Sequence, residues 1–370
     1  MRLSFYAIVK NEQHNLPRCL ESVRPYVDEL VIVDTGSEDE TIAIARHYGA
    51  DIYHFTWCDD FAAARNVALA HVTGDWILTL DADEDLVIND PNWKTLLTVD
   101  SSISVYWLTR IEMSQPITPL QAPRLFRNLP EFSYVGRYHE QLAYRHQDVP
   151  NTMIRPVTNL HIRHYGYSDD RLLEKNLTRD IPMLERIRAQ EPLSLLLLMT
   201  LADAYLRTGQ EEQARSCWAE AFERIAPDLI AGNPPAEAGR LPALLYTLGS
   251  DLLYQEDYET ALLICRRGLT WFPNHPPLLH LTGMLLREMD LALGAIPYFQ
   301  RCLQLGQEGT YYREEPVDQN FMTVWAAYEL GVTYKVLGEP EAAIAAFTQA
   351  LTFDPTYDPA RQELDLLRGS

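Results

Sequence analysis

The first 80 residues alternate short apolar runs with segments of helical spacing. Apolar runs predict four strands, most of them buried on both faces, at residues 3–9, 29–33, 51–55 and 76–80. Apolar residues at helical spacing predict three helices between them, at residues 16–23, 39–48 and 61–72. Strands that alternate with crossover helices are typical of a largely parallel α/β sheet.

The pattern loosens after residue 89. Two further strands are predicted at residues 105–111 and 123–126, and aromatic and basic residues continue to about residue 167. We expect this stretch to complete the sheet and to form the acceptor side of a cleft.

From about residue 172 the pattern changes to one helix after another. Four key alanines recur with spacings of 47, 34 and 48 residues, at Ala214, Ala261, Ala295 and Ala343. The middle spacing equals the tetratricopeptide period of about 34 residues, and we attribute the longer two to loops at residues 227–240 and 306–319. The last unit fits the tetratricopeptide pattern best, with Leu330-Gly331, Tyr334, Gly338, Ala343, Phe347, Ala350 and Pro355. We therefore predict an α/β domain at residues 1–170 and an all-α superhelix of about four repeats at residues 171–370.

The charge balance narrows the choice of partners. The chain has 370 residues, of which 47% are hydrophobic, and 52 Asp and Glu against 31 Lys and Arg give a net charge of −21. So many apolar residues exclude a mostly disordered chain, and so acidic a surface argues against general binding to nucleic acid. The chain can still bind an anionic small molecule where a metal or local amides neutralise that ligand.

The cysteines and the apolar runs indicate a cytoplasmic protein. Five scattered cysteines without a CxxC pair suit buried thiols better than disulfides or a zinc site. Residues 1–9 are too short for a signal peptide, and residues 193–201, the longest internal apolar stretch, are about half of a membrane span. We expect no transmembrane segment.

Charged and polar residues follow three of the predicted strands. Lys10-Asn11-Glu12 follows the first strand, Asp34 the second and Asp81-Ala82-Asp83 the fourth. Ligands of open α/β sheets bind beyond the carboxyl ends of the strands, so this edge is the expected site. Asp81 and Asp83 lie two residues apart and can hold Mg²⁺ or Mn²⁺ through oxygen, which would neutralise a diphosphate. The alternative for the Asp-x-Asp pair is a solvated acidic turn.

Several ordered segments resemble family 2 glycosyltransferases with the GT-A fold. The resemblance covers about the first 170 residues and rests on five segments: 7–12 (AIVKNE), 33–37 (VDTGS), 63–66 (AARN), 74–78 (GDWIL) and 81–84 (DADE). The most similar subgroup joins this domain to tetratricopeptide repeats and includes peptide S-glycosyltransferases of bacteriocin pathways. Lys10 stands where the family usually has tyrosine.

The resemblance implies roles for the residues of the donor site. Asp34 is expected to bind the nucleotide base, commonly uracil, beside the loop of Lys10, Asn11 and Glu12. Arg65, with Asn66, is expected to approach the nucleotide or its diphosphate, although ordinary solvation of a helix is the alternative for both. Asp81 and the adjoining Ala82 are expected beside the ribose or a metal-bound water, and Asp83 on the metal.

Two later residues complete the implied site. Inverting transfer needs a carboxylate to accept the proton of the acceptor, and we assign Glu140 to this role. The alternative is that Glu140 pairs with Arg124 or Arg137. A histidine at the end of the domain often completes the metal site of GT-A enzymes, which makes His164 a candidate third ligand; a structural histidine is the alternative.

These observations predict a metal-dependent inverting glycosyltransferase. Its donor would be a nucleotide sugar, commonly linked to UDP, with Mn²⁺ or Mg²⁺ as the cofactor. The repeats would recruit a protein or peptide acceptor, or mediate association of the chain with itself. The competing hypothesis is a binding protein whose α/β domain has lost catalysis.

Overall fold

The computed structural model describes residues 1–166, 169–235 and 240–369, and it divides into two compact units. The first contains residues 1–115 and 119–175, and the second contains residues 116–118 and 176–370. Within the described residues, no helix is both long and apolar enough to cross a membrane.

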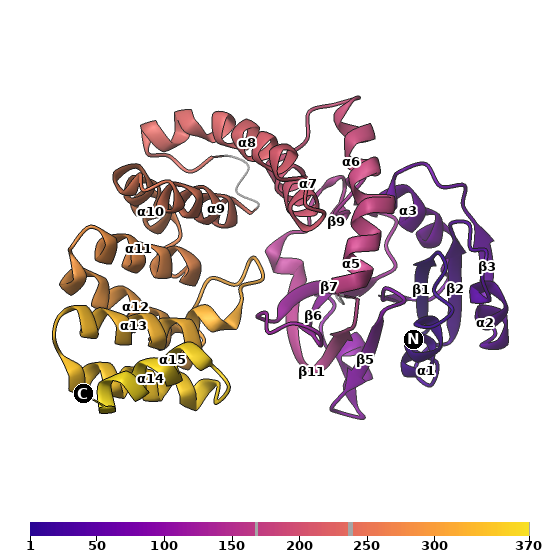
Figure 1. Ribbon diagram of the computed structural model, residues 1–370. Coiled ribbons are helices and arrows are strands. Elements are labelled where there is room, and N and C mark those ends of the chain that lie inside the picture. The colour runs from indigo at the N-terminus through magenta and orange to yellow at the C-terminus, as the bar shows by residue number, and fades with distance from the viewer. Residues whose placement is uncertain (167–168, 236–239, 370) are drawn as a thin grey trace. The chain divides into compact units, whose positions relative to one another are not determined.

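An eight-stranded sheet forms the centre of the first unit. Its strand order is β3-β2-β1-β4-β7-β6-β11-β5, and β1, β2 and β3 lie side by side in Figure 1. The strands are β1 (Leu3–Val9), β2 (Glu29–Asp34), β3 (Asp51–His54), β4 (Trp76–Thr79), β5 (Glu84–Ile88), β6 (Val105–Glu112), β7 (Leu120–Arg127) and β11 (Ile154–His164). The four strands at the N-terminal side are mutually parallel, as predicted. The other half is mixed, because β7 pairs antiparallel with β4 and β6, and β5 with β11.

Helices cover both faces of this sheet because the strands bury side chains on both sides. On one face, Leu3, Phe5 and Ala7 of β1 pack with residues of α1 (Leu16–Val23) and α2 (Thr41–His47). On the other, Tyr6 packs with α3 (Phe61–His71) and with a three-stranded sheet of β8 (Phe132–Val135), β9 (Gln141–Tyr144) and β10 (Gln147–Asp148). Short helices α4 (Leu96–Val99) and α5 (Asp169–Lys175) complete the unit.

The acidic segment after β4 forms a strand that the sequence did not predict. Glu84 and Asp85 begin β5, which pairs antiparallel with β11 at the edge of the sheet, and both side chains are buried. Asp85 accepts two hydrogen bonds from Arg163 of β11, each 2.8 Å long. A buried carboxylate needs such partners, and here they come from residues far along the chain.

The second unit is all-helical and consists largely of antiparallel helix pairs (Figure 1). After α6 (Ile181–Arg188), the described α-helices are α7 (Leu195–Arg207), α8 (Glu211–Ala231), α9 (Leu241–Tyr254), α10 (Tyr258–Trp271), α11 (Pro276–Glu288), α12 (Ala292–Glu308), α13 (Val324–Val336), α14 (Pro340–Phe353) and α15 (Asp358–Gly369). Small residues let the paired helices approach closely. A Cβ on Gly283 or Gly331 would lie 2.6 Å from the ring of Phe299 or Phe347, respectively.

The two loops expected between repeats are shorter than predicted. Helix α8 continues through Pro227 to Ala231, and α12 continues to Glu308. Each helix ends at a left-handed glycine, Gly232 with φ 84° and Gly309 with φ 65°. Proline was the misleading signal, because Pro227 stands inside α8 rather than ending it.

A buried histidine makes the helical unit sensitive to acid. His280 of α11 packs edge-on against Phe299 and Phe321, with ring centroids 5.4 and 5.3 Å away. Burial, reinforced by Arg287 and opposed by a backbone hydrogen bond with Trp325, lowers the pKa of His280 to about 4. Between the ordinary histidine value of about 6.5 and pH 4, the unfolded chain therefore binds a proton that the folded chain does not. Stability must fall as the pH falls through this window.

We predict that His280→Phe flattens the pH dependence of stability. Between pH 7 and pH 4.5, the difference between an unfolded pKa of about 6.5 and a folded pKa of about 4 costs roughly 2 kcal/mol of stability from His280 alone. Urea unfolding followed by far-ultraviolet circular dichroism at pH 7 and pH 4.5 measures this loss. The variant should lose less stability than the unmodified protein by roughly that amount. Equal losses in the two proteins would contradict the prediction.

Candidate donor and metal site

The carboxyl ends of β1, β2 and β4 bring the candidate residues to one edge of the sheet. Val9, the last residue of β1, is in register with Asp34, the last residue of β2. Tyr6 of β1 is in register with Thr79, the last residue of β4. The segments that follow these strands therefore start close together, because parallel strands end at the same edge.

Asp34 is fixed at the wall of a pocket of about 350 Å³. Its carboxylate accepts hydrogen bonds from the backbone amides of Ser37 at 3.0 Å and Gly36 at 3.2 Å. Nδ1 of His54 lies 3.3 Å from the same carboxylate. The pocket is lined by Asp34, Thr35, Gly36, His54, Phe55, Thr56 and Trp57. A buried acceptor at the wall of an accessible pocket suits a ligand that donates hydrogen bonds.

The loop after β1 braces the turn that holds Asp34. The backbone amide of Asn11 donates to Ser37 Oγ, and Asn11 Oδ1 accepts from the amide of Glu38. The amide of Glu12 donates to Thr41 Oγ1 at 2.7 Å. Lys10 is exposed. Asn11 and Glu12 thus bind the two loops together, while Lys10 faces solvent.

Arg65 and Asn66 are neighbours on α3 but have different surroundings. Arg65 is 5% exposed and donates to Asp81 Oδ1 at 2.8 Å and to Glu140 Oε1 at 2.5 Å. The side chain of Asn66 instead clamps the backbone of Tyr134, accepting from its amide at 2.7 Å and donating to its carbonyl at 2.9 Å. The structure brings Arg65, Asp81 and Glu140 together, and it pairs Glu140 with Arg65 rather than with Arg124 or Arg137.

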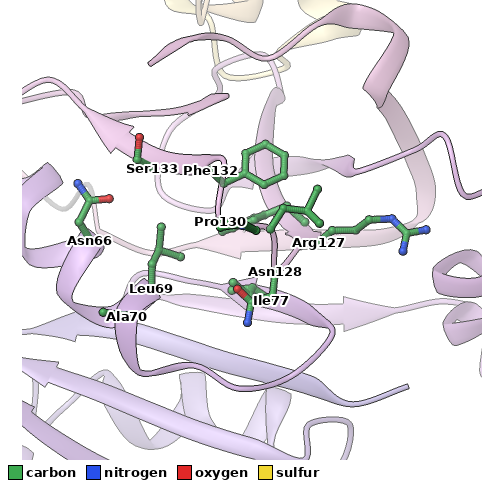
Figure 2. Close-up of a pocket in the computed structure, with 11 residues that line it drawn as sticks. Asn66, Leu69, Ala70, Ile77, Arg127, Asn128, Pro130, Phe132 and Ser133 are labelled. Atoms are coloured by element: carbon green, nitrogen blue, oxygen red, sulfur yellow. The ribbon is translucent and has the colours of Figure 1, made fainter. Parts of the chain in front are cut away.

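Asn66 lines a separate pocket of about 330 Å³. Figure 2 shows Asn66 and Leu69 on one side of this pocket, with Phe132 and Ser133 across from them. The rest of its wall mixes apolar residues, such as Ile77 and Phe126, with polar ones. Both Asn66 amide atoms are engaged with the protein backbone, which indicates a structural role for this residue.

Asp81 lies between two guanidinium groups. Its Oδ2 accepts from Arg124 at 2.7 Å, and its Oδ1 from Arg65. Burial alone would raise the pKa of Asp81, but Arg124 and Arg65 hold that pKa well below the usual range. The carboxylate is therefore ionised at neutral pH, and 37% of its side chain stays exposed. Ala82, the next residue, is buried and packs into the hydrophobic core.

Buried charges continue from Arg124 to the other side of the site. Arg124 also donates to Glu84 at 2.9 Å, and Arg110 of β6 lies 3.2 Å from the same Glu84 oxygen. Burial and the neighbouring Asp81 raise the pKa of Glu84 despite these two arginines. Sequence reasoning missed Arg110 and Glu112. Their signal was the period of two along a strand, which places both side chains on one face.

Asp83 and His164 form a second cluster with Glu112 and Lys175. His164 Nε2 lies 3.6 Å from Asp83 Oδ2, and His164 Nδ1 lies 2.6 Å from Glu112 Oε2. Lys175 Nζ is 3.5 Å from Asp83 Oδ2. Burial opposes ionisation of Asp83, yet the hydrogen bond and charge of His164, with Lys175, lower its pKa to about 2.

These residues fit a divalent cation with two protein ligands better than the predicted three. Asp83 offers an ionised oxygen, and His164 offers a ring nitrogen once Nε2 has lost its proton, while Glu112 on the other ring nitrogen orients the imidazole. Asp81 is instead engaged by Arg65 and Arg124. Across the part of the chain that the structure describes, no group of three His, Cys, Asp or Glu is placed to hold a metal ion. Mg²⁺ often takes only one or two protein carboxylates, with phosphate and water as its other ligands.

Gly166 packs tightly against the side chains of Asp83 and His164, and we predict that Gly166→Ala strongly weakens UDP binding in the presence of Mn²⁺. A Cβ at this position would lie 2.2 Å from Asp83 Oδ2 and 2.7 Å from His164 Nε2. The added methyl group must push these atoms apart. We expect at least a tenfold loss of Mn²⁺-dependent UDP affinity. Substitutions that disturb the orientation of metal ligands generally lower metal affinity by about 10- to 100-fold. Titration calorimetry with UDP and Mn²⁺ measures it.

Gly136→Ala provides a contrasting variant. A Cβ there would come no closer than 3.7 Å to its nearest neighbour, the Cα of Glu140, although the φ of 92° strains any residue other than glycine. This variant should therefore lose stability without the same loss of metal dependence. Unchanged UDP affinity in Gly166→Ala would contradict the close contact at Asp83 and His164.

Two family models match parts of the chain. Residues 4–96 match glycosyl transferase family 2, and residues 326–357 match a tetratricopeptide repeat. The first match includes Asp34, Arg65, Asp81 and Asp83, and it ends before Glu140 and His164.

Two curated relatives match parts of this chain. A TPR repeat-containing protein of Synechococcus elongatus is 36% identical over 235 residues, which cover 61% of this chain and 58% of that protein. The prophage-derived glycosyltransferase SunS of Bacillus subtilis is 26% identical over 196 residues, covering 50% of this chain and 44% of SunS. The chain thus aligns with about half of the length of these relatives.

Part of this chain is similar to part of a solved structure, that of glucosyl-3-phosphoglycerate synthase of Mycobacterium tuberculosis in complex with Mn²⁺, UDP and glucosyl-3-phosphoglycerate. The similarity covers 30% of this chain and 44% of that one, at 22% identity and a TM-score of 0.26. The family models and the observed architecture together identify the two parts: the chain carries an N-terminal glycosyl transferase family 2 domain of mixed α/β structure, followed by a helical tetratricopeptide repeat region.

Proposed function

We propose that this chain is an inverting glycosyltransferase that takes a sugar from a UDP-linked donor. The observation that carries the proposal is the edge formed by β1, β2 and β4. It combines the pocket at Asp34 with the ionised pair Asp81 and Asp83 inside the segment that matches family 2. The pocket suits a base that donates a hydrogen bond, and N3–H of uracil is such a donor.

Asp83 and His164 are the residues that would hold a divalent cation. Such a cation, Mn²⁺ or Mg²⁺, neutralises the diphosphate of the donor when it is bound. Glu112 holds the imidazole of His164 in place for this role. Lys175 adds a positive charge beside the same carboxylate.

Arg65 acts in this proposal by positioning two carboxylates. It is buried, and its guanidinium is engaged by Asp81 and Glu140, so it is not exposed for direct contact with phosphate. The bond to Arg65 fixes one oxygen of Glu140. Glu140 would then accept the proton of the acceptor as that acceptor attacks the anomeric carbon.

The repeat region would bind the acceptor and bring it to the catalytic domain. Tetratricopeptide arrays stack helix pairs into extended surfaces that suit peptides and proteins. We therefore propose a peptide or protein acceptor, recruited by residues 176–370, with self-association of this region as a further role.

Thermal unfolding with nucleotides tests the proposal directly. A ligand that binds only the folded chain at 100 times its Kd stabilises it by about 2.7 kcal/mol. UDP with Mn²⁺ should raise the Tm, and GDP or ADP with Mn²⁺ should not. Release of sugar from a UDP-sugar, followed by mass spectrometry, then tests transfer. A chain that responds to no nucleotide would favour a repeat scaffold without catalysis.

A further inference from the structure

The pocket at Asp34 has an aromatic wall that the roles described above do not use. Phe55 and Trp57 line it, from the segment between β3 and α3. Phe55 also packs against the hydrophobic core, and Trp57 is half-buried. Lys10, Asn11 and Glu12, which begin the loop after β1, have side chains without an aromatic face.

The indole of Trp57 is held rigidly. Its Nε1 donates to Asp59 Oδ1 at 3.0 Å, and its ring meets Phe61 edge-on, with centroids 4.7 Å apart. Asp59 has a left-handed backbone with φ 57°. A non-glycine residue in this conformation is retained only where its surroundings support it, and such residues cluster at ligand sites.

The same segment is tied to the loop that carries Glu140. The amide of Phe61 donates to the carbonyl of Arg137 at 2.9 Å, and Arg137 Nε donates to the carbonyl of Asp59 at 3.2 Å. Phe61 also meets Tyr138 edge-on, with centroids 5.8 Å apart. An aromatic chain of Trp57, Phe61 and Tyr138 therefore connects the pocket to the segment before Glu140.

We propose that Trp57 stacks on the nucleobase of the donor while Asp34 accepts a hydrogen bond from the edge of that base. This inference rests on the proposed function and adds a residue that determines the affinity of the donor. A planar base needs one polar contact at its edge and one flat apolar contact on its face. Asp34 and Trp57 provide these two contacts in one pocket.

Substitutions of Trp57 in the full chain test the proposal. Stacking of one base on an aromatic side chain is worth about 1–3 kcal/mol, which is about 5- to 150-fold in affinity. Titration calorimetry with UDP and Mn²⁺ should show a loss within this range for Trp57→Leu. Trp57→Phe keeps a smaller aromatic face and should lose less.

Trp271→Leu is a matched control. Trp271 is also half-buried, its Nε1 also donates to an oxygen, the carbonyl of Gly232, and it belongs to the helical unit. Its removal should lower the Tm without changing the Kd of UDP. The Tm of each variant, measured without ligand, separates lost stability from lost binding.

Three results would overturn the assignment of Trp57. In the first, folded Trp57→Leu binds UDP as the unmodified chain does. In the second, Trp57→Phe and Trp57→Leu lose affinity equally, which would indicate packing rather than stacking. In the third, Trp271→Leu weakens binding as much as Trp57→Leu. An unmodified chain that binds no nucleotide would instead refute the proposed function itself, and the role of Trp57 with it.

Discussion

Replacing Asp83 by asparagine is expected to abolish the Mn²⁺-dependent binding of UDP while the fold stays intact. The side chain is 9% exposed and lies beside His164 Nε2 and Lys175 Nζ. Asparagine has nearly the same shape, and the backbone carbonyl of Asp83 keeps its bond from the amide of Tyr165. Only the negative charge disappears. Changes around metal ligands cost about 10- to 100-fold in metal affinity, so loss of a ligand should cost at least about 100-fold.

Asp85→Asn is the matched control for this variant. Asp85 is also a buried carboxylate with a basic partner, but that partner is Arg163 at the edge of the sheet. Its substitution should lower stability and preserve the effect of Mn²⁺ on UDP binding. Calorimetric titration of UDP with and without Mn²⁺ compares the two variants. If Asp83→Asn still showed the full effect of Mn²⁺, Asp83 would not be the metal ligand.

Replacing Glu140 by glutamine is expected to lower turnover by about 10²- to 10⁴-fold, the usual cost of losing a positioned base. The amide oxygen of glutamine can still accept the hydrogen bond that Arg65 donates to Glu140 Oε1. Arg65 should therefore stay in place, and with it Asp81. Glutamine cannot take up the proton of the acceptor. Turnover of a UDP-sugar should fall, while the Kd of UDP should change by less than about threefold, which corresponds to ~0.65 kcal/mol.

Because Glu140 accepts a hydrogen bond from Arg65, Glu140→Gln distinguishes a general base from a residue that only holds Arg65 in place. A residue that only holds Arg65 would tolerate glutamine, so normal turnover would show that Glu140 is not the base. Lost UDP binding would indicate that Glu140 is structural. Glu131→Gln is a suitable control, because Glu131 pairs with Arg145 at 3.7 Å and lies 35% exposed.

Much of the architecture was predictable because it depends on local patterns. The apolar runs of β1, β2 and β4 and the helical spacing between them depend on neighbours within one element, and the structure contains these elements near the predicted bounds. The small and aromatic residues of the repeats also act locally, as Gly331 and Phe347 show within one helix pair. The position of Asp34 and Asp81 at the ends of strands followed from the same patterns.

The prediction failed where charged residues were buried through distant partners. Glu84 and Asp85 have the composition of an exposed turn, yet they form the edge strand β5, because Arg110, Arg124 and Arg163 neutralise them. The loop expected around Pro227 is helix, because the signal that ends α8 is Gly232.

The sequence by itself determined the alternation of β1 to β4 with α1 to α3 and which segments of the chain meet at the carboxyl edge of the sheet. Only the tertiary structure decided which charges pair there. Arg65 and Glu140 are 75 residues apart, and Glu84 and Arg124 are 40 residues apart. Local periodicity does not specify such partners. A buried charge pairs with whichever opposite charge the fold brings within reach, because leaving it unpaired in a low dielectric is costly.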